Sequence, residues 1–355
     1  MVTLYIAIVF IIVLSLVFRE RKGNNTSAYL MICFGLMLLL HTFFNPEFSD
    51  NYFYKIGFAE YKSMSFGEVL KYNSPSLKAE TGYRVLCKLI SYITSDWVVC
   101  MFVISAIMIS GYFITVKEYS SICWLSILLI MTGPFSQSLF VLRQHLAMGV
   151  MLLSFPFILR RQFIPYLLII LIAFSFHQTV AIFFPTYFLY NMRRTKIVYI
   201  LLTISFVLLY YYFSFILTYA ASFAMETASY SETYFEYNST YGSNNKMALL
   251  MVAILLLRIL LLKNEFFKEG FNRLCSIIVL VGTIISIVGI GYLGTNRLNM
   301  YYTSLAFLYI PNTFSYFRQK GIRFFACVGY FLFTLFFLIK NAQETNLEGF
   351  WFFHG

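Results

Sequence analysis

Apolar runs long enough to cross a lipid bilayer recur along the whole chain. A membrane-spanning helix needs about 20 apolar residues, with a lower limit near 17. Segments that meet or approach this length are 2–18, 28–44, 97–116, 138–159, 197–213, 247–262, 274–292, 298–317 and 324–340. Hydrophobic residues make up 60% of the chain and charged residues only 12%, whereas soluble domains carry roughly 25% charged residues. The sequence therefore predicts an all-α integral membrane protein.

Two further apolar segments are less regular. Residues 122–135 form a short run that ends at Gly133-Pro134, and residues 163–190 form a run too long for one simple span. Because His177 interrupts the second run, we predict two shorter helices that meet at residues 175–177. The total is then a polytopic bundle of about 12 transmembrane helices, although a re-entrant pair fits this segment equally well. Residues 84–96 are predicted to form a helix at the membrane interface.

The distribution of charge predicts the orientation. The chain carries 26 Lys and Arg against 15 Asp and Glu, and cytoplasmic loops of membrane proteins are enriched in Lys and Arg. This rule explains the basic balance without nucleic acid as a partner. It places most acidic residues outside, in two loops at 45–82 and 226–246 and in the C-terminal segment, with both termini outside. We expect one membrane domain over 1–355, with loop 45–82 folded as a cap.

Cysteine usage predicts neither a metal nor a redox site. The six cysteines are scattered through apolar segments, and none forms a Cys-x-x-Cys pair. Buried cysteines of this kind behave as small hydrophobic residues. We therefore expect no metal and no cofactor.

Polar residues within the predicted spans mark candidate functional positions, because charged groups in a bilayer are costly. Arg143, Gln144 and His145 follow one another near the predicted outer end of a helix. One interpretation of Arg143 is a guanidinium that snorkels to the lipid headgroups. Three consecutive polar side chains point around the helix, however, which a simple anchor does not require. Arg258 lies near the predicted inner end of its helix, and snorkelling is sufficient to explain it.

Two further polar residues map to the predicted outer edge. His177 lies between two strongly apolar stretches and is either a satisfied packing residue or part of a small polar cavity. Arg297 falls at a short predicted turn without an acidic neighbour in the sequence. It therefore needs a carboxylate or an anionic ligand from elsewhere.

The first predicted outer loop contributes acidic candidates at its two ends, Asp50 and Glu80. Acidic residues in loops are often merely solvated. Together with the two arginines and His177, however, they form a set at one side of the membrane. The planar fork of arginine suits phosphate or diphosphate, and a carboxylate or imidazole can accept a proton from a hydroxyl. This combination favours an enzyme that transfers sugar from a lipid diphosphate.

The order and spacing of five short motifs resemble the EpsG family, a branch of the Wzy-type polysaccharide polymerases. The motifs are Asp50-x-x-x-Tyr54, Glu80-x-Gly82-Tyr83, Gln137 with Arg143-Gln144-x-x-Ala147, Phe176-His177, and Arg297. The resemblance extends over nearly the whole chain and implies a GT-C-like helical architecture. It also implies a glycosyltransferase that joins undecaprenyl-diphosphate-linked oligosaccharide repeat units into O-antigen, capsule or exopolysaccharide. The implied location is the outer face of a bacterial inner membrane, and the implied partners are membrane lipid and a chain-length regulator protein.

Within this framework each candidate receives an expected role. Arg143 and Arg297 would bind the diphosphate of the donor, and Glu80, Asp50 or His177 would orient or deprotonate the acceptor hydroxyl. Supporting positions are Gln144, Tyr83 and Tyr54. Two alternatives stay open: an O-antigen ligase, which uses the same donor, and a transporter or flippase of the lipid-linked sugar. A transporter would place its polar residues near the midplane, and their position at one edge favours an enzyme.

Overall fold

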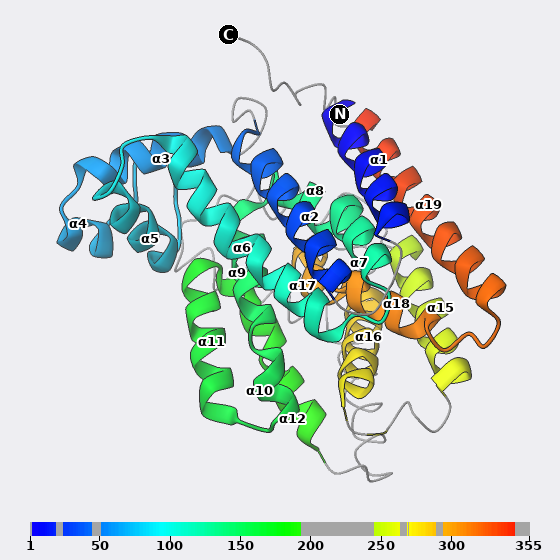
Figure 1. The fold of residues 1–355 in the computed structure, drawn as a ribbon. Coiled ribbons are helices and arrows are strands. Elements are labelled where there is room, and N and C mark those ends of the chain that lie inside the picture. The colour runs from blue at the N-terminus through cyan, green and yellow to red at the C-terminus, as the bar shows by residue number, and fades with distance from the viewer. Residues whose placement is uncertain are drawn as a thin grey trace. The chain divides into compact units, whose positions relative to one another are not determined.

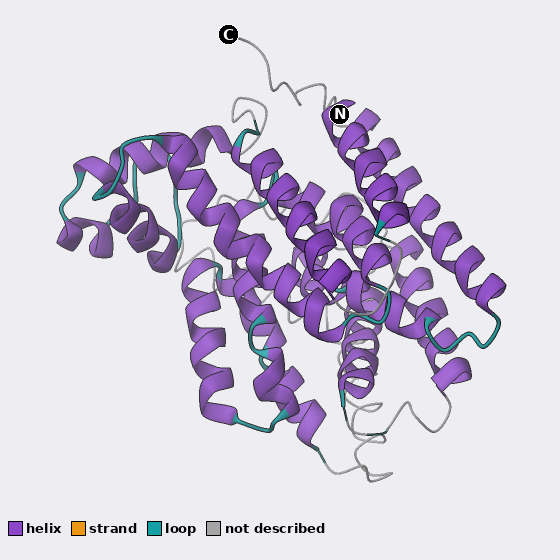
Figure 2. Ribbon diagram, viewed as in Figure 1, coloured by secondary structure: helices purple, strands orange, loops and turns teal. Residues whose placement is uncertain are grey.

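Helices joined by short loops make up the part of the chain that the structure describes (Figure 1). The computed structural model describes residues 2–18, 24–44, 51–192, 245–262, 268, 270–288 and 294–344. No strand occurs within these ranges (Figure 2). The predicted all-helical class is therefore confirmed for the described residues. The predicted span at 197–213, Asp50 and nearly all of loop 226–246 lie outside them.

Several described helices have the length and apolar composition of membrane spans. Three segments reach full spanning length: Trp97–Tyr119, Leu142–Leu159 and Lys320–Lys340. Shorter apolar helices are Leu4–Val17, Thr26–Thr42, Phe163–Phe176, Ala248–Leu262 and Phe271–Ile287. Several apolar helices of this kind in one chain indicate a multi-pass membrane protein. The total number of spans and the orientation of the termini stay predictions.

The chain divides into two compact units, one of Met1–Ala181 with Ile310–Gly355 and the other of Ile182–Tyr309. Helices of the first unit are α1 (Val2–Val17), α2 (Asn24–Thr42), α3 (Asn51–Ser63), α4 (Phe66–Lys71), α5 (Thr81–Ser91), α6 (Trp97–Tyr119), α7 (Cys123–Ile130), the π-helix η2 (Met131–Phe135), α8 (Ser136–Ser138), α9 (Leu142–Leu152), α10 (Phe155–Leu159), α11 (Phe163–Phe176) and α19 (Lys320–Glu344). Helices of the second unit are α12 (Pro185–Asn191), α15 (Asn245–Leu262), α16 (Phe271–Val288) and α17 (Gly294–Thr303). The 3-10 helix η3 (Gln178–Phe183) and α18 (Ala306–Phe314) each cross a boundary between the units.

Helix α6 is the centre of the first unit, where it packs against both α2 and α9. At the α6–α9 contact Gly111 and Gly149 meet, and a Cβ on Gly149 would lie 2.8 Å from the Cα of Met108. Small residues at such a contact let two helix backbones approach closely, as is common in membranes. On the other side α9 packs against α11. This close packing fixes the position of α9, on which Arg143 lies.

The predicted long loop 45–82 contains helices α3 and α4, and α5 coincides in large part with the helix predicted at 84–96. We call α3, α4 and α5 together the cap (Figure 1). Tyr61 on α3 donates a hydrogen bond of 2.9 Å to the carbonyl oxygen of Leu77, and Lys88 on α5 donates one of 2.9 Å to the carbonyl oxygen of Lys62. Lys88 and Arg84 are nearly buried in the cap. The cap is therefore an ordered structure, and its two basic α5 side chains turn inward.

The segment between α7 and α9 is broken rather than continuous. Pro134 lacks an N–H and lies within the π-helix η2, and after the short helix α8 the chain leaves helical geometry at Val141, where φ is −119° and ψ is 59°. The predicted single helix over 138–159 is thus α8, α9 and α10 in succession. Helix α9 therefore begins afresh at Leu142, directly before Arg143.

The interruption predicted at residues 175–177 is found. Helix α11 ends at Phe176, His177 is extended with φ −158° and ψ 117°, and η3 follows. The N–H of His177 still bonds the carbonyl oxygen of Ala173 at 3.0 Å. His177 is therefore fixed at the end of a helix, and its side chain is turned away from the helical path.

In the second unit Arg258 does not snorkel as expected. Its side chain is fully buried and donates to the carbonyl oxygens of Tyr309 and Asn272 and to the hydroxyl of Ser276, at 3.1, 2.9 and 3.1 Å. The expectation was wrong because these oxygens, contributed by neighbouring helices, provide a polar environment inside the unit. Arg258 connects α15 to the start of α16.

Candidate functional site

Glu80 occupies the N-cap position of α5 but does not cap it. Its backbone is extended, with φ −65° and ψ 151°, and its side chain accepts no hydrogen bond from the first turn of the helix. N-cap side chains normally accept such a bond. The carboxylate of Glu80 is therefore left for partners from other helices.

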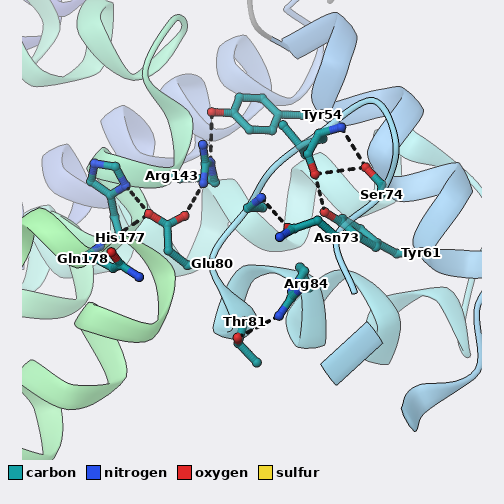
Figure 3. A network of polar contacts seen from close by, with 12 residues as sticks. Tyr54, Tyr61, Asn73, Ser74, Glu80, Thr81, Arg84, Arg143, His177 and Gln178 are labelled. Carbon is teal, nitrogen blue, oxygen red and sulfur yellow. Dashed lines mark hydrogen bonds and ion pairs between the residues drawn. The ribbon is translucent and has the colours of Figure 1, made fainter. Parts of the chain in front are cut away.

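Three donors from two distant segments surround this carboxylate (Figure 3). Arg143 Nη1 forms a close ion pair with Oε2. His177 Nδ1 lies 2.8 Å from Oε1, and the backbone N–H of Gln178 donates to the same oxygen at 3.4 Å. The side chains of Glu80, His177 and Arg143 are only 14%, 16% and 20% exposed. Glu80 thus joins the start of α9 to the end of α11.

The pKa of Glu80 reflects these contacts. Burial raises the pKa of the Glu80 carboxyl. The hydrogen bond from His177 and the positive charge of Arg143 together lower it by more than burial raises it, so the pKa of Glu80 lies below its ordinary value. The carboxylate is therefore ionised at neutral pH. An ionised carboxylate only accepts hydrogen bonds, so His177 must donate its Nδ1–H to Glu80.

Two tyrosines of the cap complete the surroundings of Arg143. Tyr54 on α3 accepts a hydrogen bond from Arg143 Nε at 3.4 Å, and its ring centre lies 5.8 Å from the guanidinium carbon. Tyr83 on α5 is fully buried and its ring lies 5.6 Å from that of Tyr54. Asn51, at the start of α3, donates to the carbonyl oxygen of Leu139 at 3.1 Å. These contacts fasten the cap to the break that precedes Arg143.

Most of the residues predicted for the site meet here. Glu80, Arg143, His177, Tyr54 and Tyr83 are brought together from four helices. Sequence reasoning assigned Glu80 and Arg143 separate tasks and missed their direct pairing, because nothing in a separation of 63 residues signals a contact.

The remaining candidates lie elsewhere. Gln144 and His145 are fully buried inside the bundle, where His145 Nδ1 lies 3.1 Å from the hydroxyl of Tyr112 on α6. Arg297 is an exposed residue of α17 in the second unit, and Asp50 falls outside the described residues. Among the described residues no group of three or more His, Cys, Asp or Glu side chains is placed to hold a metal ion.

A comparison with protein-family models gives a match to the EpsG family over residues 27–352. The chain belongs to the EpsG family. Membership suggests a role in the biosynthesis of exopolysaccharide or another surface polysaccharide. No curated protein and no solved structure matches this EpsG-family chain.

The matched range includes every residue of the cluster around Glu80. The match confirms the resemblance of the sequence to the EpsG family, and the Wzy-type polymerase activity that the resemblance implies stays a prediction.

Proposed function

We propose that this chain is a polysaccharide polymerase that joins undecaprenyl-diphosphate-linked oligosaccharide repeat units at the outer face of a bacterial inner membrane. The observation that carries the proposal is the contact of one ionised carboxylate, Glu80, with both Arg143 and His177. The guanidinium suits the diphosphate of the donor, and the imidazole suits the acceptor hydroxyl. Both groups are largely shielded from water, which strengthens their electrostatic effect.

His177 is the general base of the proposed reaction. Its Nδ1–H donates to Glu80, so Nε2 carries the free lone pair. Within the described residues Nε2 is buried and has no hydrogen-bond partner, so the proposal requires that acceptor binding opens a path to this nitrogen. A carboxylate on Nδ1 fixes the tautomer and stabilises the imidazolium that forms when Nε2 takes a proton. Glu80 itself is a poor base, because its pKa is lowered and both its oxygens are engaged.

Arg143 stabilises the leaving group. Glu80 engages Nη1 of the guanidinium and Tyr54 engages Nε, which leaves the Nη2 donors of the planar fork for a phosphate. Arg143 is also the second residue of α9, and the N-terminus of a helix favours negative charge. No side chain of a described residue caps this end of the helix.

The steps balance as a simple displacement. The acceptor hydroxyl gives its proton to His177 Nε2 while its oxygen forms a bond to the anomeric carbon of the donor sugar. The bond between that carbon and the diphosphate oxygen breaks, and undecaprenyl diphosphate leaves with the electron pair next to Arg143.

A GT-C-like bundle of about 12 spans would keep both polyprenyl tails in lipid while the cap covers the sugars outside. Arg297 is proposed as a second contact to phosphate.

The test uses a strain that lacks this protein and expresses variants at matched membrane levels. Loss of long chains with retention of single repeat units is expected for His177→Gln, Arg143→Lys and Glu80→Gln. Arg143→Lys fails because an ammonium keeps the charge but loses the planar two-pronged geometry, whereas a snorkelling anchor would tolerate lysine.

Two matched controls lie outside the cluster. Glu60→Gln removes a carboxylate that accepts hydrogen bonds from Ser76 within the cap, and Arg160→Lys makes the arginine exchange at the exposed end of α10. Both should give full-length chains. Wild-type chain length in His177→Gln and Arg143→Lys would refute the proposal. If the variants still form long chains but fail to attach them to an acceptor lipid, the protein is a ligase. If lipid-linked repeat units accumulate on the inner face of the membrane, it is a flippase.

A further inference from the structure

At one point helices α5 and α11 touch where α5 has no side chain. A Cβ built on Gly82 of α5 would overlap the Oγ of Ser175 on α11 and lie 2.6 Å from the Cβ and 2.7 Å from the carbonyl oxygen of Ser175. Real Cβ atoms essentially never approach other heavy atoms within 3.0 Å. The carbonyl oxygen belongs to the backbone of a helix and cannot rotate away. Only glycine therefore allows this approach.

This contact lies directly beside the Glu80–His177 pair. Gly82 follows Glu80 by two residues, and Ser175 precedes His177 by two residues. The distance between the two backbones at the glycine thus sets the distance between the carboxylate and the imidazole.

We propose that Gly82 is a positioning residue that brings the Glu80 carboxylate within hydrogen-bonding distance of His177 Nδ1 and Gln178 N. The positioning stands on the geometry alone, and its effect on catalysis rests on the proposed function.

The geometry gives the size of the effect. Restoring an ordinary contact of 3.4 Å from the 2.7 Å between a Cβ and the Ser175 carbonyl oxygen separates the backbones by about 0.7 Å along that line. The His177–Glu80 bond of 2.8 Å would then approach 3.5 Å, and the Gln178 bond, already 3.4 Å, would be lost. A misplacement near 1 Å costs on the order of 10²-fold in rate. Gly82→Ala should lower the elongation rate by about this factor and leave acceptor affinity nearly unchanged.

Another glycine of the cap provides a matched control. A Cβ on Gly67 of α4 would meet no heavy atom within 4 Å. Gly67→Ala makes the same chemical change in a neighbouring helix and should alter neither the pair nor the activity.

Ser175→Gly is the complementary change, because it removes the Cβ and hydroxyl of Ser175. In the double variant only the carbonyl oxygen of residue 175 then opposes the methyl group that Gly82→Ala introduces.

The decisive measurement does not depend on activity. Nitrogen-15 NMR of the imidazole groups, with the His177 signals assigned by their loss in His177→Gln, reports which ring nitrogen carries the proton. We expect wild type and Gly67→Ala to show His177 protonated at Nδ1, and Gly82→Ala to show a mixture of tautomers. A Nδ1-protonated His177 that is unchanged in folded Gly82→Ala would overturn the positioning role, whatever the activity.

The outcomes separate this inference from the proposed function. A changed tautomer with unchanged chain length would support the positioning of the pair and refute its catalytic role. If Gly82→Ala does not accumulate in the membrane, the double variant with Ser175→Gly should accumulate in part, since the two side-chain contacts are gone and only the carbonyl contact remains. No gain in accumulation over Gly82→Ala would overturn the contact as the cause.

Discussion

Replacing Glu80 by Gln tests the energetic coupling of the cluster. The change keeps the size of the side chain and removes its charge, so Arg143 loses its ion pair and His177 loses a charged acceptor. Breaking a fully buried pair costs about 3–5 kcal/mol, and a hydrogen bond to a charged group contributes about 1.5–3 kcal/mol. With Glu80 and Arg143 14% and 20% exposed, we take the lower range and expect a loss of about 2 kcal/mol in the free energy of unfolding.

The pH dependence of this loss has a definite sign. The pKa of Glu80 is lowered from 4.5 in the folded protein, so its contribution is fully present above pH 4.5 and is lost as the pH falls through the folded value. Below that value wild-type Glu80 is protonated and resembles glutamine. The difference between wild type and Glu80→Gln should therefore shrink toward zero in acid.

Equilibrium unfolding in mixed micelles at several pH values measures this difference, with Glu60→Gln as the control. Glu60 is half-buried in the cap and accepts two hydrogen bonds from Ser76, so its replacement weakens these bonds and should change stability by about 1 kcal/mol or less. Equal stability of Glu80→Gln and wild type at pH 7, or a difference that does not shrink as the pH is lowered into acid, would refute the assigned ion pair.

Three further predictions concern other parts of the chain. Tyr54→Phe should reduce the rate of chain elongation less than about fivefold, as measured by a time course of polysaccharide synthesis. The change removes one weak hydrogen bond to Arg143 and keeps the ring, whose cation–π contact with Arg143 contributes about 0.5–1 kcal/mol. A cysteine placed at Ser63 should react with an impermeant thiol reagent in intact cells and one placed at Thr195 should not, because the acidic loops are predicted outside; the reverse pattern contradicts the orientation. Arg258→Met should lower the unfolding midpoint, because it removes three hydrogen bonds that a charged group donates inside the unit, at about 1–3 kcal/mol; an unchanged midpoint would contradict that role.

The sequence was sufficient to predict the helical class, because apolar runs of spanning length have few alternatives to helices in a bilayer. The break at His177 was also predictable, since a polar residue between two apolar runs marks the end of a helix. The breaks around Arg143 were only partly visible. Gly133-Pro134 was expected to end the run, whereas the structure continues through it as a π-helix, and nothing in the residues around Val141 signalled that α9 begins there.

The candidate residues of the site were predictable one by one, whereas their pairing was not. Glu80, Arg143 and His177 stood out because their charge or polarity is costly at a membrane. Which of them touch depends on how α5 and α11 pack, and that packing depends on the absence of a side chain at Gly82. A contact made possible by a missing side chain leaves no signal in hydropathy or charge. The same holds for Arg258, whose burial depends on oxygens supplied by other helices.

The most direct test of the central claim is a reaction with purified components. The protein, reconstituted in lipid, is incubated with its undecaprenyl-diphosphate-linked repeat unit, and the products are resolved by mass. The account predicts lipid-linked dimers and longer chains, with one undecaprenyl diphosphate released for each unit added, and loss of both products in His177→Gln while Glu60→Gln remains active. Chain growth at the wild-type rate in His177→Gln, or the absence of any chain growth by the wild-type protein, would contradict it.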